Sequence, residues 1–230
     1  MNGETAVITG ASRGIGKAVA TTFAREEIHV VLCARTRSAV ESVADEIAEM
    51  GYDATPIRAD VRDEYDVERV MEQAARINGE ITYIVANAGV YHGETGETPL
   101  TTASYSAYDD HLRTNGRGVF ATIRESLPHL ASDARILVSS GRVARTEPAG
   151  YGSYAVSKAT AEAIARGFSA DIEQPVSIVD PGLVETSLTG KSGFDPSDVA
   201  AQYLWVATEA SAKTIDGAVI DRKQWRKASR

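Results

Sequence analysis

Short apolar runs alternate along this chain with longer segments in which apolar residues recur every three or four positions. The runs predict strands at residues 5–9, 28–33, 54–59, 81–86, 136–138, 176–179 and 218–220. The longer segments predict helices at residues 18–23, 40–47, 67–74, 115–130, 153–168 and 196–207. Strands that alternate with amphipathic helices predict an α/β fold, a doubly wound parallel sheet of about seven strands with right-handed crossovers.

Length and composition favour one domain over residues 1–230. The chain has 230 residues, of which 43% are apolar, enough for one sizeable core. No repeat or Pro/Ser-rich linker divides it, and neither a basic leader nor a membrane-length apolar stretch is present. We therefore expect a soluble, cytoplasmic protein. The single cysteine, Cys33, lies within an apolar run, which predicts a packed, inert thiol.

The charge balance argues against a nucleic-acid partner. The formal net charge is −8, and a phosphate backbone would be repelled by most of the surface. One basic stretch at the end of the chain is interpreted as a solvated tail, with contact to a neighbouring subunit as the alternative. It contains Arg222, Lys223, Arg226, Lys227 and Arg230.

A glycine-rich turn follows the first predicted strand and precedes the first helix. Its sequence is Thr9-Gly10-Ala11-Ser12-Arg13-Gly14-Ile15-Gly16. In this context glycines let the backbone approach a pyrophosphate at a helix N-terminus. The phosphate loop of nucleotide hydrolases is excluded, because Lys17 is followed by Ala18 and five residues separate Gly10 from Gly16. A purely structural turn remains the alternative.

The end of the second strand indicates which dinucleotide would bind. A carboxylate there binds the ribose 2′-hydroxyl of NAD, whereas a basic group suits the 2′-phosphate of NADP. This chain has Arg35 and no acid at that place, and Arg13 can converge on the same point from the glycine turn. A guanidinium matches a phosphate through paired hydrogen bonds. The pattern favours NADP(H); two merely solvent-exposed arginines are the alternative.

Candidate acid–base chemistry centres on Tyr154 and Lys158, one helical turn apart on one face. A free phenol keeps its proton to a pH of about 10, and a nearby ammonium stabilises the phenolate. Ser139 and Ser140 end the fifth strand, at the edge where open α/β sheets bind ligands. Together they offer a general acid, its modulator and a hydrogen-bond donor. A surface tyrosine–lysine pair is the alternative.

Taken together, these motifs resemble the short-chain dehydrogenase/reductase family, classical type. The resemblance extends from about residue 5 to residue 220. The matching pieces are the turn 9–16, Asp60-Val61, Asn87-Ala88-Gly89, Asn115, Ser140, Tyr154-Ala155-Val156-Ser157-Lys158, and Pro181-Gly182 with Thr186. It implies a Rossmann fold with strand order 3-2-1-4-5-6-7.

The resemblance also implies roles for four catalytic residues. Tyr154 would exchange a proton with the substrate oxygen, and Lys158 would bind the nicotinamide ribose and lower the pKa of the tyrosine. Ser140 would hold and polarise the substrate carbonyl, with Ser139 as a possible substitute because thirteen residues separate Ser140 from Tyr154. Asn115 would support a water-linked proton path to Lys158.

The implied cofactor site runs along the same edge of the sheet. Asp60 and Val61 would bracket the adenine ring, and Thr186 would bind the nicotinamide carboxamide. The cofactor-binding residues implied are Gly10, Ser12, Arg13, Gly14, Ile15, Gly16, Arg35, Asp60, Val61, Asn87, Ala88, Gly89, Tyr154, Lys158, Pro181, Gly182 and Thr186. No metal site is predicted.

The resulting hypothesis is an NADP(H)-dependent oxidoreductase that moves a hydride between nicotinamide and a carbonyl or secondary alcohol carbon. NAD(H) remains possible, in an NAD-dependent alcohol or sugar dehydrogenase. A non-catalytic dinucleotide sensor is the alternative of another class. The partner is then a small-molecule carbonyl or alcohol substrate, and by analogy a second copy in a homodimer or homotetramer.

The sequence does not choose a substrate. Seven residues are expected to wall the substrate pocket: Tyr91, His92, Arg142, Val143, Tyr151, Leu183 and Val184. A loop histidine such as His92 is more often a surface residue than a substrate contact.

Overall fold

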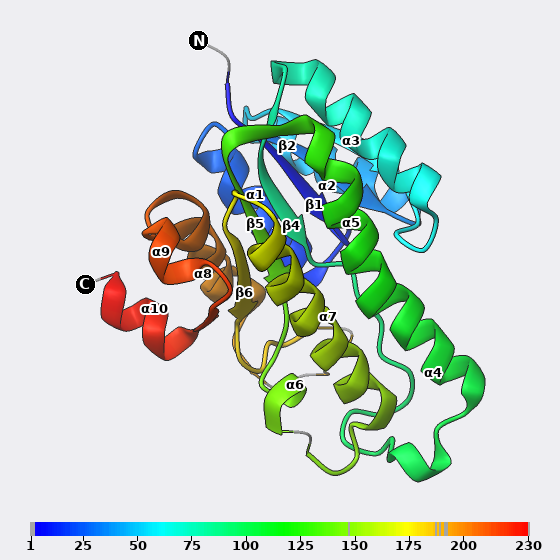
Figure 1. Ribbon diagram of the computed structural model, residues 1–230. Helices are drawn as coiled ribbons and strands as arrows, with labels where there is room; N and C mark the ends of the chain where they lie inside the picture. The colour runs from blue at the N-terminus through cyan, green and yellow to red at the C-terminus, as the bar shows by residue number, and fades with distance from the viewer. Residues whose placement is uncertain (1–2, 147, 187, 189, 191–192, 230) are drawn as a thin grey trace.

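One parallel sheet forms the centre of the molecule. The computed structural model describes residues 3–146, 148–186, 188, 190 and 193–229 (Figure 1). In that part of the chain seven strands pair in the order β3-β2-β1-β4-β5-β6-β7, all parallel. The strands are β1 Thr5–Thr9, β2 His29–Ala34, β3 Ala54–Arg58, β4 Ile81–Ala86, β5 Leu130–Ser139, β6 Val176–Asp180 and β7 Val219–Asp221. The fold class and strand order are those expected from the sequence.

Helices cover both faces of the sheet, because alternate strand residues point to opposite sides. Ala6 and Ile8 of β1 belong to one core cluster, whereas Val7 belongs to the other. The first face is covered by α1 Gly14–Arg25, α2 Arg37–Glu49 and α8 Pro196–Thr208. The second is covered by α3 Glu64–Asn78, α5 Gly118–Ser126 and α7 Gly152–Asp171. Shorter helices are α4 Tyr105–His111, α6 Val143–Thr146, α9 Ala212–Ile215 and α10 Arg222–Ala228.

The helix expected over residues 115–130 has different bounds. It begins at Tyr105, where the Ser104 hydroxyl caps the first turn by accepting from the Ala107 amide at 3.2 Å. It then continues through a π-helical segment, Leu112–Arg117, into α5, and Figure 1 shows the three as one rod. Pro128 lies in a short 3₁₀ turn, after which Leu130 already pairs with Ile81 in the sheet. The sequence pattern did not predict the first turns of this helix, from Tyr105 onward, because they carry few apolar residues.

Lys223, Arg226 and Lys227 are exposed to solvent as predicted, but the basic end of the chain is not an unstructured tail over residues 222–228. They form α10, which begins with a capping box: Asp221 accepts from the Gln224 amide at 2.7 Å, and the Gln224 side chain accepts from the Asp221 amide at 2.9 Å. Arg230 lies outside the described residues. None of the described helices is long and apolar enough to cross a membrane.

Candidate active site

A large cavity lies at the carboxyl edge of the sheet, where the turns after β1, β2, β4, β5 and β6 meet. Its volume of about 810 Å³ is in the range of small-molecule sites, roughly 300–1,000 Å³. Most of the predicted site residues line it: Gly10, Ser12, Arg13, Gly14, Ile15, Arg35, Asp60, Val61, Asn87, Ala88, Gly89, Ser140, Tyr154, Lys158, Pro181, Gly182 and Thr186. Gly16 and Asn115 are absent from the lining and support it from behind.

The glycine turn is shaped to bring backbone close to a ligand. Gly10 has φ +69°, a conformation that side chains other than glycine rarely adopt. At Gly16 an added Cβ would lie 2.3 Å from the Gly10 carbonyl oxygen, so only glycine lets α1 start against the turn. The first turn of α1 holds no acidic residue. Its free amides and positive dipole end therefore suit a pyrophosphate.

The adenosine end of the cavity carries unneutralised positive charge. Arg13 and Arg35 are exposed and form no ion pair within the part of the chain that the structure describes. The nearby Asp60 carboxylate is held by Arg62, with Nε–Oδ1 and Nη2–Oδ2 distances of 3.0 and 2.6 Å. Burial alone would raise the pKa of Asp60, but the hydrogen bonds from Arg62 outweigh it and lower that pKa. Asp60 is therefore ionised and already paired, and the two free arginines face the ligand space.

Asn87 connects the glycine turn to β5 in the middle of the cavity. Its Nδ2 donates to the Thr9 carbonyl at 3.1 Å, and its Oδ1 accepts from the Ser139 hydroxyl at 3.1 Å. The Ser139 hydroxyl also accepts from Tyr203 at 3.0 Å. Asn87 and Tyr203 thus satisfy the Ser139 hydroxyl within the protein, so this side chain stabilises the structure of the site.

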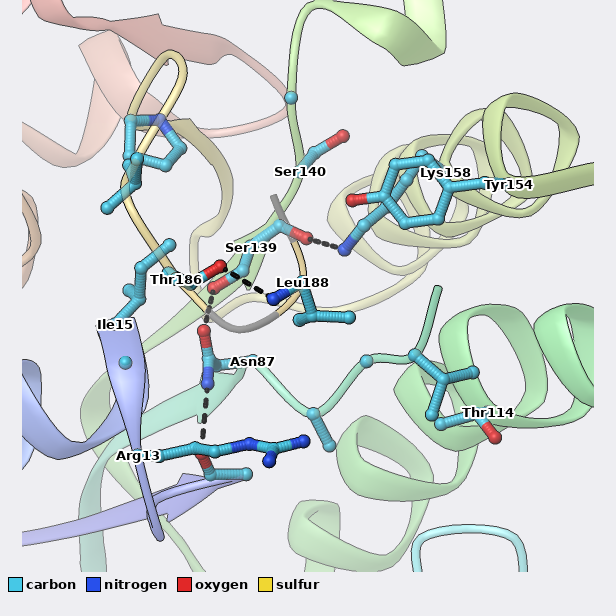
Figure 2. A pocket seen from close by; sticks show the side chains of 18 of the residues that line it. Arg13, Ile15, Asn87, Thr114, Ser139, Ser140, Tyr154, Lys158, Thr186 and Leu188 are labelled. Atoms are coloured by element: carbon cyan, nitrogen blue, oxygen red, sulfur yellow. Dashed lines mark hydrogen bonds between the residues drawn. The ribbon is translucent and has the colours of Figure 1, made fainter. Parts of the chain in front are cut away.

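Tyr154 and Lys158 lie side by side in α7, as Figure 2 shows, with Lys158 Nζ 6.0 Å from the Tyr154 ring centroid. Nζ donates to the Ser139 carbonyl at 3.0 Å. Burial lowers the pKa of Lys158 to about 8, against the opposing charge of Glu162. Burial, then Tyr91 and Tyr151, raises the pKa of Tyr154, so the phenol holds its proton in the protein alone. Tyr154 can therefore act as a proton donor, and the phenolate that remains would lie near the Lys158 ammonium.

Ser140 is held by an ionic network that sequence reasoning missed. Its hydroxyl donates at 2.8 Å to Glu162, which is 1% exposed. Arg145 of α6 bonds both Glu162 and Asp180. Glu162 follows Lys158 by four residues, so the spacing of Tyr154, Lys158 and Glu162 on one helix face was a usable signal. Nothing in the sequence indicates the part played by Arg145.

Asn115 lies in the π-helical segment and is fully buried. Its Oδ1 accepts from the Val90 amide at 2.8 Å, and its Nδ2 donates to the Val90 carbonyl at 3.0 Å and to Ser157 at 2.9 Å. The side chain thus joins the loop after β4 to α7, next to Lys158. Single π turns inside α-helices are frequent at functional sites.

Two of the seven expected wall residues lie elsewhere. Arg142, Val143, Tyr151, Leu183 and Val184 line the cavity, whereas Tyr91 and His92 do not. Tyr91 instead packs its ring against that of Tyr154, with centroids 4.8 Å apart. His92 Nε2 bonds Asp110 at 2.8 Å, on the far side of the buried His111. The loop after β4 turns these side chains toward the helix and away from the ligand space.

Comparisons with known proteins agree with this geometry. The sequence profile of the family described as short chain dehydrogenase matches residues 4–196. Versicolorin reductase stcU of Emericella nidulans is 33% identical over 193 residues, 82% of this chain and 72% of that protein. Oxidoreductase UcpA of Salmonella typhimurium is 31% identical over 194 residues, with the same two shares.

Solved structures show the same architecture over nearly the whole chain. A dehydrogenase/reductase from Sinorhizobium meliloti superposes with a TM-score of 0.87 at 29% identity, covering 96% of this chain and 94% of the other. A short chain dehydrogenase from Burkholderia cenocepacia, solved in complex with NADP, has a TM-score of 0.86 at 26% identity and covers 96% of each chain. With its strand order and the paired Tyr154 and Lys158, this chain belongs to the short-chain dehydrogenase/reductase family, in its classical form, and is an oxidoreductase.

Proposed function

We propose that this protein is an NADPH-dependent reductase that converts a carbonyl group to a secondary alcohol, with Tyr154 as the general acid. The observation that carries the proposal is the layout of a single cavity. Arg13 and Arg35, which form no ion pair with any described residue, lie at one end, and the half-buried Tyr154 and the buried Lys158 lie at the other. Figure 2 shows Arg13 on one side of Asn87 and the tyrosine–lysine pair on the other.

The residues present fit a nicotinamide dinucleotide phosphate. The glycine turn and the amides of α1 suit the pyrophosphate, and two free guanidiniums suit a 2′-phosphate. All eight of the next residues line the cavity. Asp60 and Val61 would border the adenine, and Asn87, Ala88 and Gly89 the central part of the cofactor. Pro181, Gly182 and Thr186 would border the nicotinamide end. The Burkholderia relative bound to NADP, and an alcohol dehydrogenase from Thermococcus sibiricus bound to 5-hydroxy-NADP at 26% identity, support this choice.

Each catalytic side chain would then have one task. Bound NADPH supplies the hydride to the carbonyl carbon. Tyr154 donates its phenolic proton to the carbonyl oxygen, which leaves an alcohol and a phenolate. The charge of Lys158 stabilises that phenolate, because the ammonium lies in a buried, weakly screened site.

Ser140 and Asn115 would support this transfer. The Ser140 hydroxyl donates to Glu162 in the structure, so its contact with a substrate oxygen requires it to exchange one acceptor for the other. Arg145 keeps Glu162 neutralised when this happens. Asn115 fixes the loop at Val90 and the neighbouring Ser157, and so keeps a water path to Lys158 open.

The test is carbonyl-dependent oxidation of NADPH, followed by loss of nicotinamide absorbance over a panel of ketones, aldehydes and quinones. The wild-type protein is expected to reduce at least one class, with NADPH preferred to NADH. Tyr154→Phe should remove the reaction while keeping NADPH binding, measured by fluorescence titration. The matched control is Tyr105→Phe, at a tyrosine that is 90% exposed in α4. Unchanged turnover in Tyr154→Phe, or no turnover by the wild type with any carbonyl, would overturn the proposal.

A further inference from the structure

A second hollow, of about 590 Å³, adjoins the active-site cavity and is strongly basic. Five cationic side chains and two carboxylates line it together with Gly182 and Phe194: Arg142, Arg222, Lys223, Arg226 and Lys227, with Asp180 and Asp221. We name this region the basic hollow. Arg142 and Gly182 line both it and the active-site cavity, so the two spaces are neighbours.

The two carboxylates of the basic hollow are already used by the scaffold. Asp180 is bonded by Arg145 and also accepts from the Gly182 amide at 3.0 Å. Asp221 caps α10. By contrast, Arg142, Lys223, Arg226 and Lys227 form no ion pair with any residue that the structure describes. In a chain with a net charge of −8, this local excess of positive charge is not a consequence of composition.

Arg222 ties the basic hollow to the loop that borders the substrate end. Its guanidinium carbon lies 3.9 Å from the centre of the Phe194 ring, and its Nη1 donates to the Asp198 carbonyl at 3.2 Å. Phe194 in turn exchanges backbone hydrogen bonds with Leu183 and Glu185 on the loop after β6. The Nε atom of Arg222 is buried without a partner in the described structure. A buried donor of this kind is costly unless an acceptor reaches it.

Mutual repulsion makes this arrangement unfavourable for the protein alone. Burial, then the charge of Arg226, lowers the pKa of Arg222. Cations that face one space and repel each other are stabilised by an oxyanion in that space, since guanidiniums and ammoniums bond carboxylate and phosphate oxygens strongly.

We infer that the basic hollow binds an oxyanion carried by the substrate, so that the preferred substrate is a carbonyl compound with a carboxylate or phosphate remote from the reacting carbon. This inference rests on the proposed reductase function. With the carbonyl at Tyr154, the remainder of the molecule passes Arg142 and Gly182, and its charged end is held by Arg222 and Arg226. Neutral ketones fill only the active-site cavity and bind more weakly.

The experiment uses carbonyl compounds in matched pairs that differ only in the anionic group. One arm is a series of keto acids of increasing length, beginning with levulinate, each paired with its methyl ester. The other arm is the phosphate ester of 5-hydroxypentan-2-one paired with 5-hydroxypentan-2-one itself. The wild-type protein is expected to show a higher kcat/KM for the anionic member in one arm, and that arm identifies carboxylate or phosphate. Added salt should reduce the ratio, because the charges of the basic hollow are partly exposed.

Arg226→Glu tests the basic hollow, because Arg226 lies outside the active-site cavity. The ratio of kcat/KM for the anionic member to that for the neutral member should fall by about fivefold or more, through KM. Turnover of the neutral member should stay within about twofold. Arg226→Lys should keep the ratio. Lys213→Glu, an equal charge change on α9 outside the basic hollow, should leave it unchanged.

A binding measurement separates this inference from the function on which it rests. Trp225 lies on α10, with its ring 5.7 Å from the Arg222 guanidinium carbon, so oxyanion binding should alter its fluorescence. Inorganic phosphate and levulinate serve as probes, with Trp225→Phe as the blank. A change that Arg226→Glu removes, together with the shifted ratio, supports the inference. Neutral ketones reduced with no preference for anions would overturn it and leave the reductase standing. If no carbonyl is reduced at all, the reductase fails and the substrate assignment fails with it.

Discussion

The two ends of the active-site region both carry arginines that have no carboxylate partner in the described part of the chain, but the fold assembles them differently. At the adenosine end, Arg13 and Arg35 follow β1 and β2, which are neighbouring strands paired in register from Thr5 with His29 to Thr9 with Cys33. At the substrate end, Arg142 follows β5, whereas Arg226 comes from α10 near the end of the chain. The first pair is brought together by strand order alone. The second group needs the tertiary placement of a short helix.

A further contrast lies within one short helix region. Arg142 and Arg145 are three residues apart, yet among the described residues Arg145 bonds two carboxylates and Arg142 bonds none. Arg145 therefore supports the structure of the site, because Glu162 and Asp180 neutralise its charge. Arg142 faces both cavities and keeps its charge for a ligand. An arginine's role here is decided by its partners, which residue type and spacing do not reveal.

The largest expected effect comes from Lys158→Met, which acts at the substrate end of the cavity. Loss of the ammonium should lower kcat for carbonyl reduction by about 10²- to 10⁴-fold, because the phenolate of Tyr154 loses its stabilising charge. The thermal midpoint should not fall. Lys158 is 7% exposed and carries a charge that burial disfavours, and this cost offsets the hydrogen bond to the Ser139 carbonyl that the substitution removes.

Steady-state kinetics and thermal unfolding check this prediction. Lys17→Met is the control, at a lysine of α1 whose ammonium pairs with Glu46 and lies outside the cavity. A variant that keeps its activity would show that the ammonium does not assist Tyr154. A variant that unfolds at a lower temperature would show that Lys158 is needed for the scaffold, and then the rate would carry no information on chemistry.

The next effect tests the adenosine end alone. Arg35→Asp should weaken NADPH binding by roughly ten- to a hundredfold, the worth of hydrogen bonds to a charged phosphate, and leave NADH binding equal or tighter. Parallel fluorescence titrations with the two nucleotides measure it. Arg37→Asp is the matched control, because Arg37 pairs with Glu41 on the surface of α2 and does not line the cavity. Equal binding of both nucleotides by the wild type would favour the NAD-dependent alternative.

The adenosine end could be predicted from the sequence because its signals are local. Each strand is followed at once by its ligand-facing residues, as with Gly10 after β1 and Asn87 after β4, and parallel strands align those ends. The expected bounds of β1 and β4 agree with the structure residue for residue.

The substrate end could not be predicted to the same degree, because its partners are distant in the chain. Ser140 donates to Glu162, which Arg145 bonds in turn, and no periodicity indicates that Arg145 meets the other two. His92 looked available by residue type, yet Asp110 binds it. The fold of residues 222–228 depends on a cap at Asp221 that follows a three-residue strand, too short for hydropathy to mark its end.

Acid should affect the two ends differently. His111, at the substrate end, is 2% exposed, and its Nε2 accepts from the His92 amide at 3.1 Å, so the ring is neutral. Burial, then the charge of His92, lowers the pKa of His111 to about 4, from 6.5 when unfolded. As pH falls below 6.5 the unfolded chain takes up a proton that the native ring does not, so stability falls. The loss between pH 7 and pH 5 should be about 2 kcal/mol.

Urea unfolding at several pH values measures that loss. His111→Gln should flatten the dependence between pH 7 and pH 5, whereas the other titrating groups, including His29, contribute equally to both proteins and cancel. Asp60 at the adenosine end has a lowered pKa, so its stabilisation is lost only below the usual carboxylate range. Equal slopes for wild type and His111→Gln would show that the substrate end is not the acid-sensitive one.

The smallest expected effect on activity comes from Glu162, which lies between Arg145 and Lys158. Its charge raises the pKa of Lys158 against the lowering by burial. In Glu162→Gln that support is lost, so the alkaline limb of the reduction rate, expected near pH 8 in the wild type, should move to lower pH. The amide can still accept from Ser140. Glu173→Gln, at an exposed carboxylate after α7, is the control.

The pH profile distinguishes two ways in which Glu162 can act. If the limb moves and kcat at neutral pH is nearly kept, Glu162 acts on Lys158 through its charge. If kcat falls and the limb stays, Glu162 acts through the position of the Ser140 hydroxyl, since Arg145 would then pull away toward Asp180. An unchanged profile and rate would leave Glu162 as a partner of Arg145 alone. The charges of Glu162 and Arg145 would then have no effect on Lys158 or Ser140. Arg145 would serve only the structure of the protein, whereas Arg142 would remain available to a ligand.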